Sequence, residues 1–307
     1  MKSIFFTGKG GVGKSTLSAT VAWQLAEKGY RVLATSFDPA HNLGDIFAMK
    51  LTHKKKRYKK SSLWLQETDL EKAAEEYLEA NTGLLEEVYS YTRAFNMDRY
   101  FTLLKYSPGV EEYAALTSLE TILRREEENF DYIVFDTPPT GLTLRIMALP
   151  QLTLNWLARL IKIRKEILEK RYTIHNITGK YDKEGTRLAY KEEDDTVIRK
   201  LYEMQKRYTR VRETLESPST SIAVICNPDY LSYRESERLV KGLLELNLPL
   251  RVLLDNKVTP ELRENADRVE RDLLAGRSDI RAQRIELIDD SQPACYIMDK
   301  DLTEAFI

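Results

Sequence analysis

Short apolar runs alternate with longer stretches of helical spacing over much of the chain. Each run is four to six residues long and is followed by polar loop residues, a pattern typical of buried strands in a parallel sheet. Helical spacing follows the first run over Lys14–Lys28 and ends at Gly29. The predicted strands are Ile4–Thr7, Arg31–Ser36, Leu63–Glu67, Tyr132–Asp136, Ser221–Cys226 and Arg251–Asp255, and a further candidate is Ile285–Ile288.

This alternation predicts an α/β fold with a doubly wound, mostly parallel sheet, whose ligand site lies outside the carboxyl ends of the strands. Two long stretches, 69–129 and 151–217, interrupt the alternation with helical spacing, many charges and few strand signals. We expect both stretches to be helical insertions that form a subdomain above the sheet. A single domain over residues 1–307 is the expectation for such a chain.

The loop after the first predicted strand reads GKGGVGKST and satisfies the P-loop pattern GxxxxGK[ST] between a strand and a helix. In this pattern the glycines let backbone N–H groups turn toward phosphates, Lys14 reaches the β and γ oxygens, and Ser15 ligates Mg²⁺. The motif therefore predicts an ATP hydrolase that uses Mg²⁺. The predicted nucleotide-binding residues of the loop are Lys9, Gly10, Gly11, Val12, Gly13, Lys14, Ser15 and Thr16.

Two carboxylates follow later strands of the predicted sheet. Asp38 opens the segment DPAHNLGD, and Asp136 opens the segment DTPPTG. Phosphoryl transfer needs an oriented water and a metal that bridges the β and γ oxygens. We therefore expect Asp38 to position the water and Asp136 to lie in the outer shell of the metal. Capping of the next helix is the structural alternative for either residue, and His41 is interpreted as structural.

Lys9 is an additional lysine inside the loop, one residue after its first glycine. At this position its side chain is expected to point across the phosphates, where it could serve the opposite subunit of a homodimer. A cation supplied in trans to the γ-phosphate contributes about a thousand-fold to a hundred-thousand-fold in rate. Such an arrangement would couple hydrolysis to dimerisation.

Composition narrows the class of partner. The 47 basic and 48 acidic residues give a net charge of −1, so no broad field favours nucleic acid, and no nucleic-acid partner is expected. Cys226 and Cys295 form no CxxC pair, which argues against a disulfide framework and structural zinc, and Cys226 is predicted to be a buried core thiol. The two cysteines without a CxxC pair fit a reducing, cytoplasmic setting, and the absence of a leader or a long apolar span predicts a soluble chain.

Two segments carry open alternatives. The basic run 53–60, HKKKRYKK, is interpreted as a mobile solvated loop, with contact to anionic lipid, an acidic receptor face or nucleic acid as the alternative. The apolar residues between Leu152 and Ile163, which include Trp156, either pack in the core or line a groove for the hydrophobic helix of a client protein.

The motifs together resemble the ArsA family of deviant-Walker ATPases, which includes the arsenite-pump ATPase and the cytosolic factor that targets tail-anchored membrane proteins. GKGGVGKST resembles the deviant Walker A loop of the family, and DPAHNL and DTPPTG resemble its two switches. The likeness continues at 107–112, 227–232 and 255–256. The chain is similar to an archaeal- or bacterial-type single-copy form, because no zinc-binding CxxC follows Asn256.

The resemblance implies roles for individual residues and for the whole protein. It makes Lys9 the intermonomer lysine, Asp38 the residue that activates water, Asn256 an adenine contact, and Asp229 a nucleotide contact near or across the dimer interface. It implies a nucleotide-gated homodimer that couples ATP hydrolysis to targeting of hydrophobic membrane-protein tails. The alternatives are an energising subunit of an arsenite or anion pump, which the scarcity of thiols disfavours, and a partitioning or positioning ATPase.

Overall fold

The computed structural model describes residues 1–38, 42–78, 107, 109–178, 189–287 and 300–307. Contacts divide the chain into two compact units. The larger unit combines Met1–Met147 with Leu215–Ile307, and the smaller unit is Ala148–Thr214. The boundaries of the smaller unit lie within three residues of those predicted for the second insertion, 151–217.

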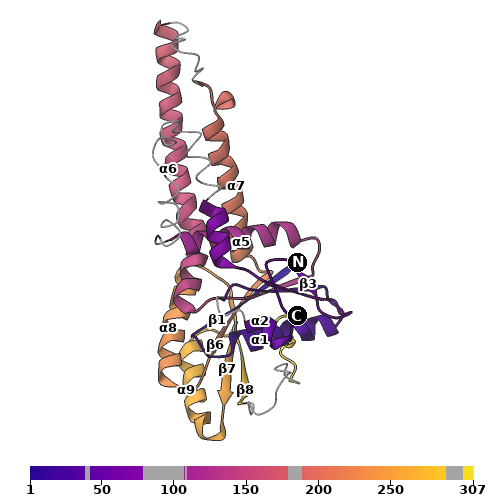
Figure 1. The fold of residues 1–307 in the computed structure, drawn as a ribbon. Coiled ribbons are helices and arrows are strands. Elements are labelled where there is room, and N and C mark those ends of the chain that lie inside the picture. Colours follow the sequence, from indigo (N-terminus) through magenta and orange to yellow (C-terminus); the bar gives the residue numbers. More distant parts are fainter. Residues whose placement is uncertain (39–41, 79–106, 108, 179–188, 288–299) are drawn as a thin grey trace. The chain divides into compact units, whose positions relative to one another are not determined.

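The larger unit is built on an eight-stranded sheet (Figure 1). The strands lie in the order β3-β4-β2-β5-β1-β6-β7-β8, and every neighbouring pair is parallel except β3 and β4. The α/β prediction with a doubly wound, mostly parallel sheet is therefore confirmed. The strands are β1 Lys2–Gly8, β2 Val32–Ser36, β3 Lys56–Arg57, β4 Leu63–Glu67, β5 Tyr132–Asp136, β6 Thr220–Cys226, β7 Leu250–Val258 and β8 Arg281–Glu286.

The central strands are apolar runs because helices cover both faces of the sheet. On one face, Ile4 and Phe6 belong to the same buried cluster as Leu17 and Leu25 of α1 (Lys14–Glu27). On the other face, Phe5 lines a small apolar cavity together with residues of α5 (Val110–Glu126) and of the start of α6 (Thr140–Thr178). The remaining described α-helices of this unit are α2 Asn42–Ile46, the helical residues 70–78, α8 Tyr230–Glu245 and α9 Arg263–Leu274, and short 3₁₀ helices cover Pro260–Leu262 and Thr303–Ala305.

The edge strand β8 differs from its prediction. It covers Arg281–Glu286, whereas the predicted run was Ile285–Ile288, of which Ile288 lies outside the described residues. Because β8 lies at the edge of the sheet, it is only partly covered, and of its residues Ile285 alone is buried. The sequence of such an edge strand is largely polar, so its apolar residues do not show where the strand begins and ends.

The basic run 53–60, expected to be a solvated loop, contains a two-residue strand. Lys56 and Arg57 form β3, which pairs antiparallel with β4. The Lys55 ammonium lies 2.5 Å from a carboxylate oxygen of Glu126 and over the rings of Trp64 and Phe130. The run therefore closes one edge of the sheet.

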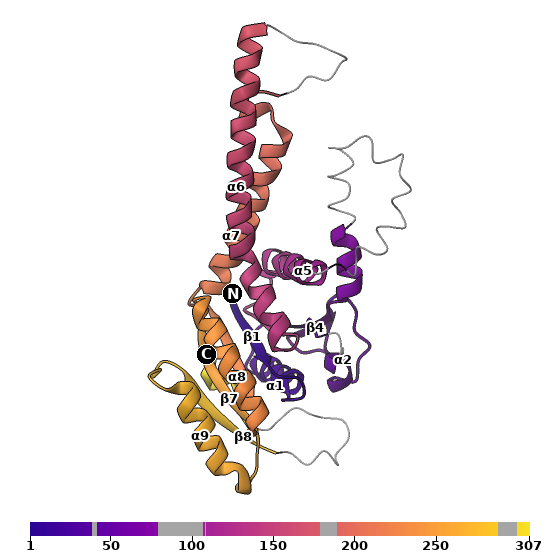
Figure 2. The same ribbon diagram turned by 90° about the vertical axis from the view of Figure 1, so that its left-hand side faces the viewer.

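The smaller unit contains the C-terminal part of α6 and most of α7 (Thr196–Glu216), which lie side by side (Figure 2). Arg164 of α6 donates two hydrogen bonds of 3.1 and 2.6 Å to the Asp195 carboxylate, which also accepts from the Ile198 N–H in the first turn of α7. Within the described ranges, no helix combines the length and the apolar character needed to cross a membrane.

Both predicted insertions contain helices where the structure describes them, 69–129 within the larger unit and 151–217 mainly within the smaller one. In 69–129 the helical parts are residues 70–78 and α5, and residues 79–106 and 108 lie outside the described part. In 151–217 they are α6, a short 3₁₀ turn at Glu192–Asp194 and α7, and residues 179–188 lie outside.

Candidate nucleotide site

The P-loop connects the end of β1 to the start of α1, as its sequence predicted. Gly11 and Gly13 have φ angles of +79° and +99°, in the region that glycine adopts without a steric penalty. A Cβ atom at Gly8 would lie 2.3 Å from the carbonyl oxygen of Ile225, and one at Gly13 would lie 2.4 Å from Nδ2 of Asn256. The glycines are therefore required by backbone conformation and by the close approach of β6 and β7.

Three carbonyl oxygens of the P-loop accept hydrogen bonds from side chains. The Lys14 ammonium donates to the carbonyl of Lys9 at 3.3 Å, and the Lys257 ammonium donates to that of Gly11 at 3.0 Å. The Asn256 amide donates to the carbonyl of Val12 at 2.7 Å. Because N–H and C=O groups of one peptide point in opposite directions, holding the carbonyls directs N–H groups of the loop toward the other side, as in anion-binding loops.

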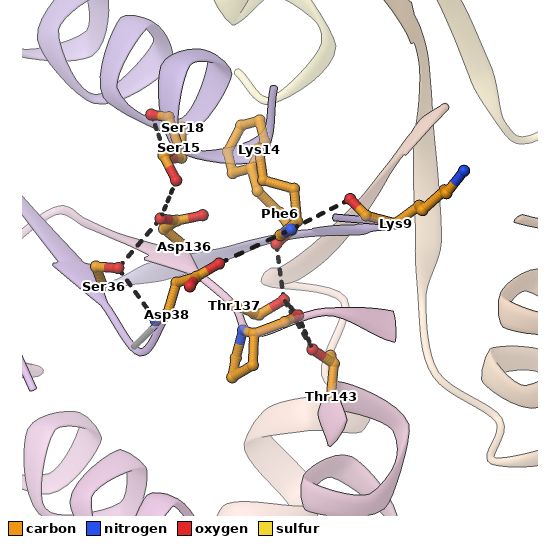
Figure 3. A network of polar contacts seen from close by, with 11 residues as sticks. Phe6, Lys9, Lys14, Ser15, Ser18, Ser36, Asp38, Asp136, Thr137 and Thr143 are labelled. Atoms are coloured by element: carbon orange, nitrogen blue, oxygen red, sulfur yellow. Dashed lines mark hydrogen bonds and ion pairs between the residues drawn. The ribbon is translucent and has the colours of Figure 1, made fainter. Parts of the chain in front are cut away.

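A buried network connects the P-loop with both later motifs (Figure 3). The Ser15 hydroxyl donates to Oδ2 of Asp136 at 2.7 Å, and the Ser36 hydroxyl donates to the same oxygen at 3.1 Å. The backbone N–H of Asp38 donates to the Ser36 hydroxyl at 3.2 Å. The ends of β2 and β5 thus bring both predicted carboxylates to the N-terminus of α1.

Asp136 is held in an environment that disfavours its charge. Its side chain is buried, with the residue 1% exposed, and Oδ1 has no hydrogen-bond partner. Burial raises the pKa of this carboxyl from 3.8 to about 6 and is the largest influence; the hydrogen bond from Ser15 and the charge of Lys14 oppose the rise, whereas the charge of Asp38 adds to it. A cation beside Asp136 would relieve this cost.

The oxygen atoms at this point fit Mg²⁺. Mg²⁺ prefers oxygen ligands and is usually bound through one or two protein groups together with substrate phosphates and water. The Ser15 hydroxyl and the partnerless Oδ1 of Asp136 supply such groups. Among the described residues there is no cluster of three or more His, Cys, Asp or Glu residues that could hold a metal.

The side chain of Lys14 points into this network, whereas that of Lys9 points away from it. Lys14 is buried, and its ammonium is 4.0 Å from Oδ2 of Asp38. The Lys9 side chain points away from Lys14, Asp38 and Asp136 (Figure 3). Within one chain, the Lys9 ammonium is therefore directed out of the site.

The structure brings Lys14, Ser15, Asp38, Asp136 and Asn256 together, but it gives Asp229 a local role. Asp229 is the exposed N-cap of α8, and its carboxylate accepts the N–H of Ser232 at 2.9 Å. This is the helix-capping use that an aspartate at such a position commonly has.

Two residues at the site were missed by the sequence reasoning. Lys257 follows Asn256, and only the backbone conformation brings its side chain to the P-loop. Glu67 ends β4, and its carboxylate accepts the N–H of Gly44 in α2 at 2.8 Å. The position of Glu67 at the end of a predicted strand was the sequence feature that could have identified it.

The two cysteines take no part in this network. Cys226 is fully buried, as predicted, and burial is the first cause that raises its pKa well above the ordinary value. Cys295 lies outside the described residues.

The P-loop lies between a buried strand and a helix, and a serine and two strand-end aspartates lie beside it. This arrangement is that of a P-loop nucleotide-binding protein. Residues 1–305 match the family model ArsA ATPase, described as anion-transporting ATPase. The chain belongs to the ArsA ATPase family.

Relatives with names from two branches of this family align over most of the chain. A protein of Aquifex aeolicus provisionally named arsenical pump-driving ATPase 2 is 33% identical over 85% of this chain and 81% of its own length. The ATPase ASNA1 homolog of Cryptosporidium parvum is 32% identical over 84% of this chain and 65% of its own length. ATPase GET3B of Arabidopsis thaliana is 30% identical over 82% of this chain and 63% of its own length. The chain is an ATPase, as these names and the family state.

Proposed function

We propose that this ATPase is a cytoplasmic homodimer that hydrolyses Mg²⁺-bound ATP and uses the cycle to carry hydrophobic tail segments of membrane proteins. Lys14 binds the β and γ oxygens, and Asp38 orients the attacking water. Ser15 and Asp136 would hold Mg²⁺, which would offset the negative charge that develops on the phosphate oxygens. The network of Ser15, Ser36 and Asp136 supports this assignment because it joins all three motifs.

The fixed orientation of Asn256 supports adenine as the base. Its Nδ2 donates to the Val12 carbonyl, which leaves Oδ1 as the acceptor. Adenine carries an amino donor at the position where guanine carries a carbonyl acceptor. An Oδ1 directed at the base would accept a hydrogen bond from the adenine amino group, which would favour ATP over GTP.

The outward direction of Lys9 supports the homodimer (Figure 3). The groups that bind and position the γ-phosphate in this chain include Lys14 and Asp38, but the Lys9 ammonium is directed elsewhere. A second copy would allow each Lys9 to complete the site of the other chain. A trans cation of this kind stabilises the charge of the transition state.

The proposal that this chain binds hydrophobic tail segments rests on a row of exposed apolar residues on α6, here called the outer stripe. Its members recur every three or four residues apart from one gap of seven, and each is between 37% and 78% exposed. They are Leu152, Trp156, Leu160, Ile163, Ile167, Ile174 and Ile177.

A second apolar row of α6 is buried and forms the side of the helix that packs in the core, whereas the outer stripe lies outside the core. Leu154, Leu157, Ile161 and Leu168 are at most 9% exposed and form the inner face of the helix. The apolar segment between Leu152 and Ile163, for which core and groove were open alternatives, therefore contains both kinds of residue. Helix α6 therefore has a second apolar face, which is exposed among the described residues.

The dimensions of the outer stripe fit a membrane-spanning helix. From Trp156 to Ile177 the helix rises about 32 Å at 1.5 Å per residue, close to the roughly 30 Å of a bilayer hydrocarbon core. Exposed apolar residues gathered on one face of a helix in this way commonly mark an interaction site. A hydrophobic tail helix would bury the outer stripe through anchors at the same spacing.

The test is co-expression with a tail-anchored membrane protein, followed by gel filtration of the ATPase fraction. We expect the tail protein to co-elute with the wild type and to be lost from Ile163→Asp. Lys162→Asp is the matched control, because it places the same charge at an exposed neighbouring position outside the outer stripe. ATP hydrolysis should be retained by both variants. Equal retention of the tail by wild type and Ile163→Asp would contradict the proposal.

An anion-pump subunit is the second candidate, favoured by the Aquifex relative and by the description of the family. In this chain the described cysteine is unsuited to bind a metalloid, because Cys226 is buried and its thiol is kept protonated. Stimulation of ATP hydrolysis by arsenite would support this candidate. Stimulation by an oxyanion without arsenite sensitivity would support a pump for a different anion.

A further inference from the structure

Strand β7 departs from regular pairing at Asn256 and Lys257, next to the P-loop. Its pairing with β6 extends as far as Asp255, and its register with β8 shifts between Asp255 and Val258. Lys257 has a φ of +58°, which is uncommon for a residue with a Cβ atom. The two residues form a bulge at the carboxyl end of the strand.

The bulge lets two successive side chains reach the same loop. In a regular strand, successive side chains point to opposite faces. Here Asn256 donates to the carbonyl of Val12, and Lys257 donates to the carbonyl of Gly11, its neighbour in the P-loop. A bulge residue re-aims its side chain in this manner. The unfavourable conformation of Lys257 is thus connected to a specific contact at the nucleotide site.

We propose that Lys257 is a positioning residue for phosphate binding, and this inference rests on the proposed binding of ATP at the P-loop. By holding the Gly11 carbonyl on the side of β7, its ammonium keeps the adjoining N–H groups turned toward the phosphates. It also places a positive charge beside the anion-binding loop. Backbone strain that persists at a functional site is consistent with such a role.

The other two supports of the loop are buried, but Lys257 is exposed. Lys14 and Asn256 are at most 5% exposed, so changes at either disturb the core together with the loop. The Lys257 side chain approaches the loop from the surface. Its removal should therefore change the affinity for nucleotide without unfolding the chain.

The first test compares Lys257→Met with Lys257→Arg in the full-length protein. Met keeps the length of the side chain and removes the ammonium, so we expect the Kd and KM for ATP to rise about tenfold, the effect of losing one charge-assisted hydrogen bond. The value of kcat should stay within about twofold, because Asp38 and Lys14 are untouched. Arg retains a cationic donor and should restore the Kd to within about threefold of the wild type.

A control and a second variant separate positioning from folding. Lys241→Met removes an exposed lysine of α8, whose side chain is 77% exposed, and should leave the Kd unchanged. Lys257→Gly relieves the positive φ and removes the ammonium, so it should keep the Tm of the nucleotide-free protein and still bind ATP weakly. Wild-type affinity in either Met or Gly would overturn the role of Lys257. Failure of the wild type to bind ATP would instead overturn the proposed function.

Discussion

Ser15 and Asp136 lie 121 positions apart in the chain, and the Ser15 hydroxyl donates a 2.7 Å hydrogen bond to the Asp136 carboxylate. Each comes from a different motif, and the parallel pairing of β1 with β5 brings the two together. The carboxylate is buried and keeps one oxygen without a partner. Burial of this carboxylate disfavours its charged form, and a bound cation would relieve that cost.

We predict that Asp136→Asn stabilises the nucleotide-free protein and abolishes Mg²⁺-dependent ATP hydrolysis. An acid whose pKa rises on folding, here from 3.8 to about 6, destabilises the fold once the pH exceeds 3.8, and the full penalty applies above 6. Replacing it with a neutral amide should add about 3 kcal/mol to the free energy of unfolding at pH 8, and about half of that at pH 5. Urea denaturation at both pH values measures the difference, and a gain that grows toward acid pH would contradict it.

We predict that Lys9→Ala and Asp38→Asn complement each other in mixed dimers. Each variant alone should lose turnover, because each lacks one group at every site. If Lys9 acts in trans, a hybrid dimer contains one complete site, so an equal mixture should recover about a quarter of wild-type activity. Steady-state phosphate release after mixing and re-equilibration gives the answer. No recovery, with hybrids demonstrated by differential tags, would place Lys9 in cis.

Gly13→Ala should weaken nucleotide binding more than about tenfold, since the methyl group would displace the Asn256 amide from the Val12 carbonyl. The positive φ of Gly13 adds strain, for a combined loss of about 2–3 kcal/mol in the free energy of unfolding. Gly29→Ala is the matched control, because its φ is +92° and nothing lies within 4 Å of the new atom. It should lower stability through strain while leaving the ATP Kd, measured by titration, unchanged. Parallel changes in both variants would show that strain alone weakens binding.

Asp195→Ala should destabilise the helical unit by about 3 kcal/mol, because it leaves Arg164 without its partner and removes an acceptor from the first turn of α7. The neighbouring pair between Lys165 and Glu192 is exposed, so Glu192→Ala should have almost no effect. Thermal unfolding followed by circular dichroism compares the two variants. A smaller loss for Asp195→Ala than for Glu192→Ala would show that the buried ion pair is not what joins the two helices.

The local sequence alone predicted the P-loop and most of the sheet. One short segment contains Gly11, Gly13, Lys14 and Ser15. Their spacing in the sequence is therefore enough to predict how they lie relative to one another. Apolar runs such as Ile4–Thr7 were readable because both faces of the central strands are covered. Asp38 and Asp136 were found because strand ends in a doubly wound sheet converge on one edge.

The contacts of Lys257 and Asn256 with the P-loop could be found only in the tertiary structure. They depend on a bulge in the pairing of β7 with β6 and β8, and this bulge leaves no pattern in the sequence of β7 itself. The same holds for α6, where apolar residues recur around much of the helix. Leu157 and Leu160 are three residues apart and lie on neighbouring positions of the helix surface, so only packing within the helical unit decides that Leu157 is buried and Leu160 is exposed. The sequence determined the chemistry of the loop, whereas long-range packing determined which side chains support it and which apolar face remains open to a partner.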